Sequence, residues 1–267
     1  MAFCKDPLRT YLNNLGYNVV LLPRTGIEPF DVLGKDGKQV ERLGPLSQIW
    51  TSSVALPPLN PPQTAVGING QKTAALDLSV GLKFLSNVLA AMGASVPQLS
   101  LAYKNAKKVQ FSFTDVQVVG VDPFALGNHL GAGTLHSDNP FVTRYFTDDD
   151  TDAFIITEVL KSKTITAAAQ ASDSTGAEVD VPVIQSAVGA KVAIAQTGSE
   201  TAELTYTGSQ LLTFGHKIFR IEFINGRWAI KGQKPAGEVA FALPGIEDET
   251  QLGNDQPIVF ERFSNFA

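Results

Sequence analysis

Cys4 is the residue of this chain whose chemistry stands out, because it is the only cysteine among 267 residues. A single thiol cannot form an internal disulfide, and a chain of this length can bury a core without one. Phe3 precedes the thiol and Lys5 follows it. An aromatic residue and a cation beside a cysteine near a terminus suit a reversible acyl thioester at a membrane surface. Cys4 is therefore a candidate for lipidation, and an incidental terminal cysteine is the alternative.

Other routes to a membrane are excluded by the residues present. Ala2 stands where N-myristoylation requires glycine. The three residues before Cys4 are too few for the apolar region of a secretory signal. No later segment has roughly 18 unbroken apolar residues, so we expect no transmembrane helix. The sequence therefore predicts a protein made in soluble form in the cytoplasm.

No group of residues in the chain forms a catalytic signature. There is no G-x-S-x-G elbow and no phosphate-binding loop, and Gly131-Ala132-Gly133 lacks the third glycine of the dinucleotide motif. Without a nucleophile and a base at a recognisable spacing, the sequence predicts that the protein is not an enzyme. No cofactor is expected apart from an acyl group on Cys4.

The histidines and one acidic run are weak candidates for metal binding. His129, His136 and His216 do not have the spacing of metal ligands on a helix, and we expect the first two to lie in a loop. The run Asp148–Asp152 lacks the glycine and the terminal glutamate of a calcium loop. A helix cap or a solvated loop explains that run better, so no metal site is predicted.

The net charge is concentrated at the C-terminal end of the chain. Residues Glu238–Ala267 contain six acidic residues and one basic residue, which accounts for the whole formal charge of −5. A neutral or acidic protein is a poor general partner for nucleic acid. The segment also carries Phe260, Phe263 and Phe266, whereas a purely solvating tail has few aromatic residues. We expect this tail to dock on another surface.

The first third of the chain mixes elements of several kinds. Residues 6–16 read as a short helix with Asp6 as its N-cap. Residues 17–23 read as a buried strand, residues 31–39 as a turn-rich connection around Gly34 and Gly37, and the Pro-rich segment 56–62 as a loop. The segment Lys72–Met92 fits two patterns equally well. At a period of 3.6 it is an amphipathic helix that ends at Gly93, and at a period of two it is a strand.

Alternating polarity dominates the rest of the chain. Segments 109–121, 154–166 and 201–207 read as strands, and Asn225-Gly226 predicts a hairpin turn. Glycine and proline residues at positions 232–245 then predict a linker. The predicted fold class is therefore α+β: a twisted, mostly antiparallel central sheet with short helices around it and a C-terminal appendage.

Three features together resemble the bacterial gasdermins: the acylatable Cys4, the segments that fit both helix and strand, and the acidic, aromatic tail. The resemblance covers essentially the whole chain and is carried by Phe3-Cys4, by residues 12–24 (LNNLGYNVVLLPR) and by residues 145–163. It implies a pore-forming domain at residues 1–237 and an autoinhibitory peptide at 238–267, with a linker at about 231–250. Phe260, Phe263 and Phe266 would anchor that peptide, and Cys4 would carry a palmitoyl group.

The resemblance also implies a mechanism and partners. A caspase-like or other protease would cut near Lys234, Gly237 or Leu243, and the trimmed chain would assemble with copies of itself into a large β-barrel. The pore would permeabilise the inner membrane and kill the cell, in anti-phage defence. Membrane lipid is the expected partner, and nucleic acid is not. The alternative is a non-enzymatic, β-rich scaffold or assembly subunit with a docking tail.

Four segments have the length and alternation of membrane strands, which need about 9–11 residues. They are Asn69–Leu85, Gln98–Asp115, Lys163–Asp180 and Val188–Leu204. The residues that we expect to face lipid are Leu76, Leu78, Phe111, Phe113, Ile165, Val192 and Ile194. Asp77 and Lys191 are expected to face water.

Overall fold

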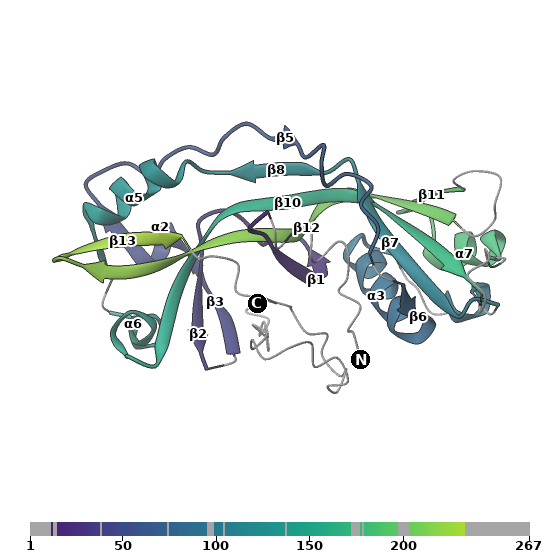
Figure 1. Cartoon of the computed structure of the whole chain (residues 1–267), viewed down its shortest axis with the longest axis horizontal. Helices are drawn as coiled ribbons and strands as arrows, with labels where there is room; N and C mark the ends of the chain where they lie inside the picture. The colour runs from purple at the N-terminus through teal and green to yellow at the C-terminus, as the bar shows by residue number, and fades with distance from the viewer. Residues whose placement is uncertain are drawn as a thin grey trace.

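Two long antiparallel strands form the spine of the protein in the computed structural model (Figure 1). They are β10 (Thr151–Gln170) and β12 (Glu203–Ile224). The structure describes residues 12, 15–37, 39–73, 75–94, 99–103, 105–136, 138–171, 177, 179–196 and 203–232. Residues 154–166, predicted as a strand from their alternation, lie within β10, so that prediction is confirmed and the strand is longer than expected.

Short strands flank the spine on both sides, so that the sheet is five strands wide at three successive levels. β10 pairs in turn with β2 (Asp31–Asp36), β8 (Gln117–Gly120) and β7 (Lys108–Thr114), and these pair with β3 (Gln39–Pro45), β5 (Gln63–Thr64) and β6 (Leu76–Asp77). β12 pairs in turn with β13 (Arg227–Gly232), β1 (Asn18–Arg24) and β11 (Ala193–Gln196). All these pairs between named strands are antiparallel. The predicted α+β class and the mostly antiparallel sheet are confirmed.

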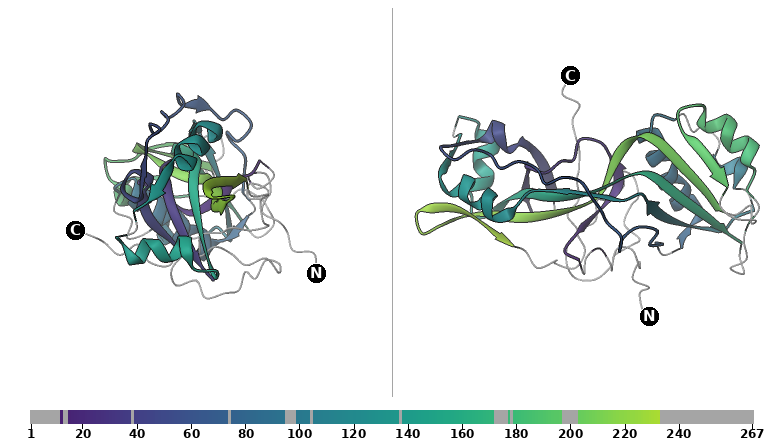
Figure 2. Two further views of the ribbon diagram at one scale, coloured as in Figure 1. Left: turned by 90° about the vertical axis from the view of Figure 1, so that its left-hand side faces the viewer. Right: turned by 90° about the horizontal axis from the view of Figure 1, so that it is seen from above.

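Helices cover the sheet at its two ends, as the view from above in Figure 2 shows. One end carries α2 (Leu46–Ile49), α5 (Pro123–Gly131) and α6 (Pro140–Thr147), with the small sheet of β4 (Trp50–Ser52) and β9 (Gly133–Leu135). The other end carries α3 (Leu78–Ala91), α4 (Leu99–Ala102) and α7 (Val181–Val188). The side chains of Asp122, Asn139 and Asp180 cap α5, α6 and α7, each followed by a proline in the first turn.

The prediction of a turn-rich connection at residues 31–39 is wrong. Residues 31–36 form β2, and Gly37, with a φ of 56°, lies in the turn to β3. Gly34 belongs in the strand because the Tyr145 ring of α6 packs directly on it: a Cβ there would lie 2.6 Å from the ring. The sequence shows a glycine, but it does not show the aromatic ring 111 positions away that requires it.

Other local predictions agree with the structure. β1 covers the predicted buried strand, and the segment 56–62 forms no helix or strand. Asn225 and Gly226, with φ angles of 52° and 80°, form the turn between β12 and β13. The predicted helix at residues 6–16 lies mostly outside the described residues.

Candidate functional site

The four candidate segments meet at one end of the spine, the right-hand end of Figure 1. Asn69–Leu85 contains β6 and the start of α3, and Gln98–Asp115 contains α4 and β7. Lys163–Asp180 begins in the far half of β10, and Val188–Leu204 contains β11 and the start of β12. Their strands are neighbours in the order β6-β7-β10-β12-β11. Segments that are far apart in sequence therefore form one continuous surface.

The strand register places apolar side chains on one face of this end. Ile165 of β10 lies opposite Phe113 of β7 on one side and Tyr206 of β12 on the other. Directly paired residues share a face, and the face alternates along each strand. The same face therefore receives Leu76, Val109, Phe111, Ala167, Ala169, Ile194 and Leu204.

The opposite face is polar along the same strands. Thr166 lies opposite Ser112 and Thr205, and its hydroxyl is 2.8 Å from that of Thr205. Gln170 donates a hydrogen bond to Gln110 over 2.9 Å. At the edge, Lys72 forms an ion pair with Glu203 over 2.8 Å. The sheet is thus already amphipathic in the folded protein, with one apolar face and one hydrophilic face.

Helix α3 covers the apolar face. Leu85, Val88 and Leu89 are completely buried, which is the helical spacing of an inward stripe. Gly81 lets the helix approach β7, because a Cβ there would overlap the Val109 side chain. The Phe84 and Phe111 rings are 4.9 Å apart between centroids. The helix therefore occupies the surface that this sheet would otherwise expose.

The ambiguous segment Lys72–Met92 uses both of its patterns. Residues 70–73 and 75–77 lie along β7: the Thr73 amide donates to the Phe111 carbonyl over 2.8 Å, and Leu76 pairs with Val109. From Leu78 onward the chain is helical. The change from strand to helix occurs where Asp77 and Lys108 face one another. Local sequence alone could not have located it, because both periods continue through this point.

A buried pair of tyrosines links the sheet to the α4 region. The hydroxyls of Tyr103 and Tyr206 are 2.7 Å apart, and both side chains are fully buried. Each hydroxyl therefore satisfies the other in an apolar core.

The other candidate residues are placed as follows. Leu78 and Ile194 are half-buried and pack against the core of this end, and Val192 is buried in it. Cys4, Lys234, Gly237, Leu243, Phe260, Phe263 and Phe266 lie outside the described residues. Within the described ranges, no helix is long and apolar enough to cross a bilayer.

The histidines and aspartates have structural surroundings. His129 lies in the last turn of α5, not in a loop as predicted, and its Nδ1 is 2.7 Å from the Val54 carbonyl oxygen. His136 follows β9 and contacts the Thr51 hydroxyl. Burial lowers the pKa of His216 to about 3, so that its ring is neutral near pH 7. In the part of the chain that the structure describes, no cluster of His, Cys, Asp or Glu could hold a metal ion.

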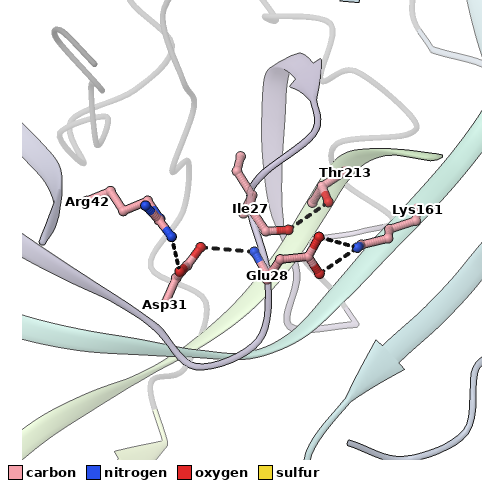
Figure 3. A network of polar contacts seen from close by, with 6 residues as sticks. All are labelled: Ile27, Glu28, Asp31, Arg42, Lys161 and Thr213. Carbon is pink, nitrogen blue, oxygen red and sulfur yellow. Dashed lines mark hydrogen bonds and ion pairs between the residues drawn. The ribbon is translucent and has the colours of Figure 1, made fainter. Parts of the chain in front are cut away.

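A polar network marks the inner boundary of the amphipathic sheet (Figure 3). Lys161 of β10 contacts both carboxylate oxygens of Glu28 at 2.5 Å, and Thr213 of β12 donates to the Ile27 carbonyl over 2.9 Å. Asp31 accepts from the Glu28 amide over 3.0 Å and from Arg42 over 2.6 Å. The hydrogen bond that Arg42 donates to Asp31 is the largest cause that raises the pKa of Arg42. Sequence reasoning missed this network because the Glu28–Lys161 pair spans 133 positions.

A curled, antiparallel sheet with these helices is the gasdermin fold. A solved structure of a bacterial gasdermin from Bradyrhizobium tropiciagri matches this chain with a TM-score of 0.65. The match covers 86% of this chain and 92% of that chain, at 16% sequence identity. At this identity the likeness establishes the fold alone.

Sequence comparison identifies the family. The model of the Bacterial Gasdermin Family matches residues 20–233. Gasdermin bGSDM of Vitiosangium sp. is 40% identical over 244 residues, 91% of each chain. Gasdermin bGSDM of a Desulfuromonadales bacterium is 36% identical over 228 residues, 85% of each chain. The chain therefore belongs to the bacterial gasdermin family, which is known for pore formation and not for enzymatic activity.

Proposed function

We propose that this chain is an autoinhibited pore-forming protein that a protease activates. Removal of the peptide at residues 238–267, by cleavage in the linker at about 231–250, allows the remaining chain to bind membrane lipid. Copies of the trimmed chain then form a large β-barrel in the inner membrane and kill the cell, in defence against phage. The uncleaved protein stays in the cytoplasm. Family membership supports the pore, and the resemblance to bacterial gasdermins supports the rest.

The observation that carries the proposal is the amphipathic sheet beneath α3. A membrane strand needs one face for lipid and one for water, and a closed barrel leaves no edge unpaired in lipid. The faces through Ile165 and Thr166 already meet the first condition. What the resting protein lacks is length in the strands beside the spine: β6, β7 and β11 are two to seven residues long, and part of the segments that would extend them is helical as α3 and α4.

The register of β6 and β7 supports the same conversion for α3. Leu76 pairs with Val109, and Asp77 pairs with Lys108. If α3 unwinds and continues this pairing, Leu82 meets Tyr103 and Phe84 meets Leu101. Leu76, Leu78, Val80, Leu82 and Phe84 then share the lipid face, while Asp77, Ser79 and Lys83 face water. The outcome is a hairpin long enough to cross the hydrocarbon core.

Dye release from liposomes tests the function. The chain trimmed at the linker is expected to release an entrapped dye, and the full chain at equal concentration is expected to release none. A scaffold subunit would bind its partner without permeabilising lipid. Trimmed, folded protein that leaves liposomes intact would contradict the proposal.

Lipidation of Cys4 is a separate part of the proposal. A sixteen-carbon acyl chain would bury apolar surface worth about 0.8 kcal/mol per CH₂ in the bilayer, and it should strengthen membrane binding after cleavage. Intact-mass analysis of protein from its native host is expected to show a palmitoyl adduct that is absent from Cys4→Ala. Leakage by trimmed Cys4→Ala should need a higher protein concentration. An unmodified mass together with full activity of Cys4→Ala would rule out this role.

A further inference from the structure

The pairing of β10 with β12 changes register at three places, and the largest change lies between the two ends of the molecule. Ser162 of β10 faces Leu212 of β12, but Thr164 faces Thr207. Lys163 alone therefore lies opposite the four residues Gly208–Leu211, of which all but Gly208 are exposed. Such an excursion breaks the ladder and bends the strand. The amphipathic sheet lies on one side of it, and the rest of the fold lies on the other.

The polar network of Figure 3 lies directly beside this excursion, on the side away from the amphipathic sheet. Lys161 and Thr213 are paired, and the pair of Ser162 and Leu212 lies between them and the excursion. Both are held by the loop of residues 25–30, which joins β1 to β2: Glu28 contacts Lys161, and the Ile27 carbonyl accepts from Thr213. A single loop therefore binds both spine strands at one pair of opposite residues, Lys161 and Thr213.

The loop is itself anchored to the half of the sheet that carries β2 and β3. The Asp31 carboxylate is buried and accepts from Arg42 of β3 and from the Glu28 amide. The Phe30 amide donates to the Ile156 carbonyl of β10 over 2.8 Å. The Lys161 side chain is 13% exposed and that of Glu28 is 46% exposed, so the ion pair is shielded from solvent on the lysine side. The contacts thus connect the spine to β2 and β3.

We propose that residues 25–30 act as a fulcrum, which holds β10 and β12 together at Lys161 and Thr213 while the sheet beyond Gly208–Leu211 is rebuilt. This inference rests on the proposed pore-forming function. Glu28 and Lys161 are positioning residues in this scheme, because they fix where the new hairpins leave the folded body. The four residues Gly208–Leu211 provide extra chain length that the rebuilt sheet can use without breaking the pair of Lys161 and Thr213.

Two disulfide staples test where the moving part ends. Leu160 faces Gly215 on the clamped side, and a Cβ at Gly215 would lie 3.4 Å from that of Leu160. A Cβ at Gly81 would lie 3.5 Å from that of Val109 and would tie α3 to β7. Both separations are close to disulfide geometry. Mass spectrometry of the L160C/G215C and G81C/V109C chains confirms each bond, and thermal unfolding confirms that each chain is folded.

The two stapled proteins should behave oppositely in dye release after trimming. Oxidised L160C/G215C is expected to leak as well as its reduced form, whereas oxidised G81C/V109C is expected to leak only after reduction. If both reduced proteins leak but oxidised L160C/G215C does not, the pore function stands and the claim that β10 and β12 stay together at the fulcrum is wrong. If oxidised G81C/V109C leaks without reduction, the claim that α3 separates from β7 is wrong. Failure of both reduced, folded chains to leak would contradict the proposed function itself.

A charge swap tests the positioning role of the ion pair. Glu28→Gln and Lys161→Met should each lower leakage by trimmed protein at least about tenfold, because each leaves a partly buried charge without its partner. Glu28→Lys combined with Lys161→Glu should restore leakage to within about threefold of the parent. Lys35→Met, in β2, is the matched control. Loss of thermal stability without loss of leakage, or failure of the swap to restore leakage, would contradict the positioning role.

Discussion

A chain that ends at Gly237 is expected to kill the cells that express it, reducing viable counts by orders of magnitude, while the full chain is harmless. Deleting Glu238–Ala267 removes the aromatic residues Phe260, Phe263 and Phe266 and the whole net charge of −5. Each charge near an anionic lipid surface contributes about 1 kcal/mol, so loss of the tail's negative charge favours approach to the membrane. Colony counts and membrane fractionation at matched expression measure both effects.

The control for this experiment is the truncated chain with Leu78→Arg, which should be expressed but benign. Placing a foreign protease site at Gly237 should make killing depend on that protease. Cleavage in the region of Lys234, Gly237 and Leu243 would then be sufficient for activation. A truncated chain that remains soluble and harmless would show that the tail is not an inhibitor.

Arginine substitutions on the two faces of the converted strands should have opposite outcomes. Leu78→Arg and Ile194→Arg place charge on the expected lipid face, at a cost of about 2–4 kcal/mol at the bilayer midplane. A cost of this size corresponds to about 30-fold or more in the membrane-inserted population of each subunit. Dye release by these two trimmed variants should therefore be nearly abolished.

Ser79→Arg and Ala195→Arg are the matched controls, one position along the same segments. Both residues are exposed in the resting protein, and an odd step along a strand moves the side chain to the aqueous face. These variants should leak within about threefold of the parent, because arginine on the lumen side costs far less. Thermal unfolding before trimming shows whether each variant is folded. Equal leakage by all four would mean that these segments do not enter the bilayer as strands.

The fold was predictable where local pattern and tertiary packing agree. Residues 154–166 alternate and form part of β10, and Asn225-Gly226 has the backbone conformation that its hairpin requires. Gly34 misled the interpretation because its reason is the Tyr145 ring, a contact that local sequence does not contain. For Lys72–Met92 the sequence supported two structures, and contact with β7 decides where each applies.

Some parts of the candidate site could likewise be predicted from the sequence, and other parts could not. Period two was enough to place Phe111, Phe113 and Ile165 on one face, because register and alternation are linked in any antiparallel sheet. The polar network of Glu28, Asp31, Arg42 and Lys161 could not be predicted from the sequence, because charged residues that are scattered along a chain show no periodic pattern. The excursion at Gly208–Leu211 is also invisible locally, because it depends on how β12 pairs with β10.

The most direct test of helix-to-strand conversion is the environment of Val80. In the resting protein Ser79, Val80 and Lys83 are all exposed on α3. A polarity-sensitive dye is attached to a single cysteine at each position in turn, in Cys4→Ala, and its emission is recorded before trimming and in the liposome-bound trimmed protein. The account predicts a blue shift at position 80 and at Leu78, with little change at 79 and 83. A dye at position 80 that remains as water-exposed as those at 79 and 83 would contradict it.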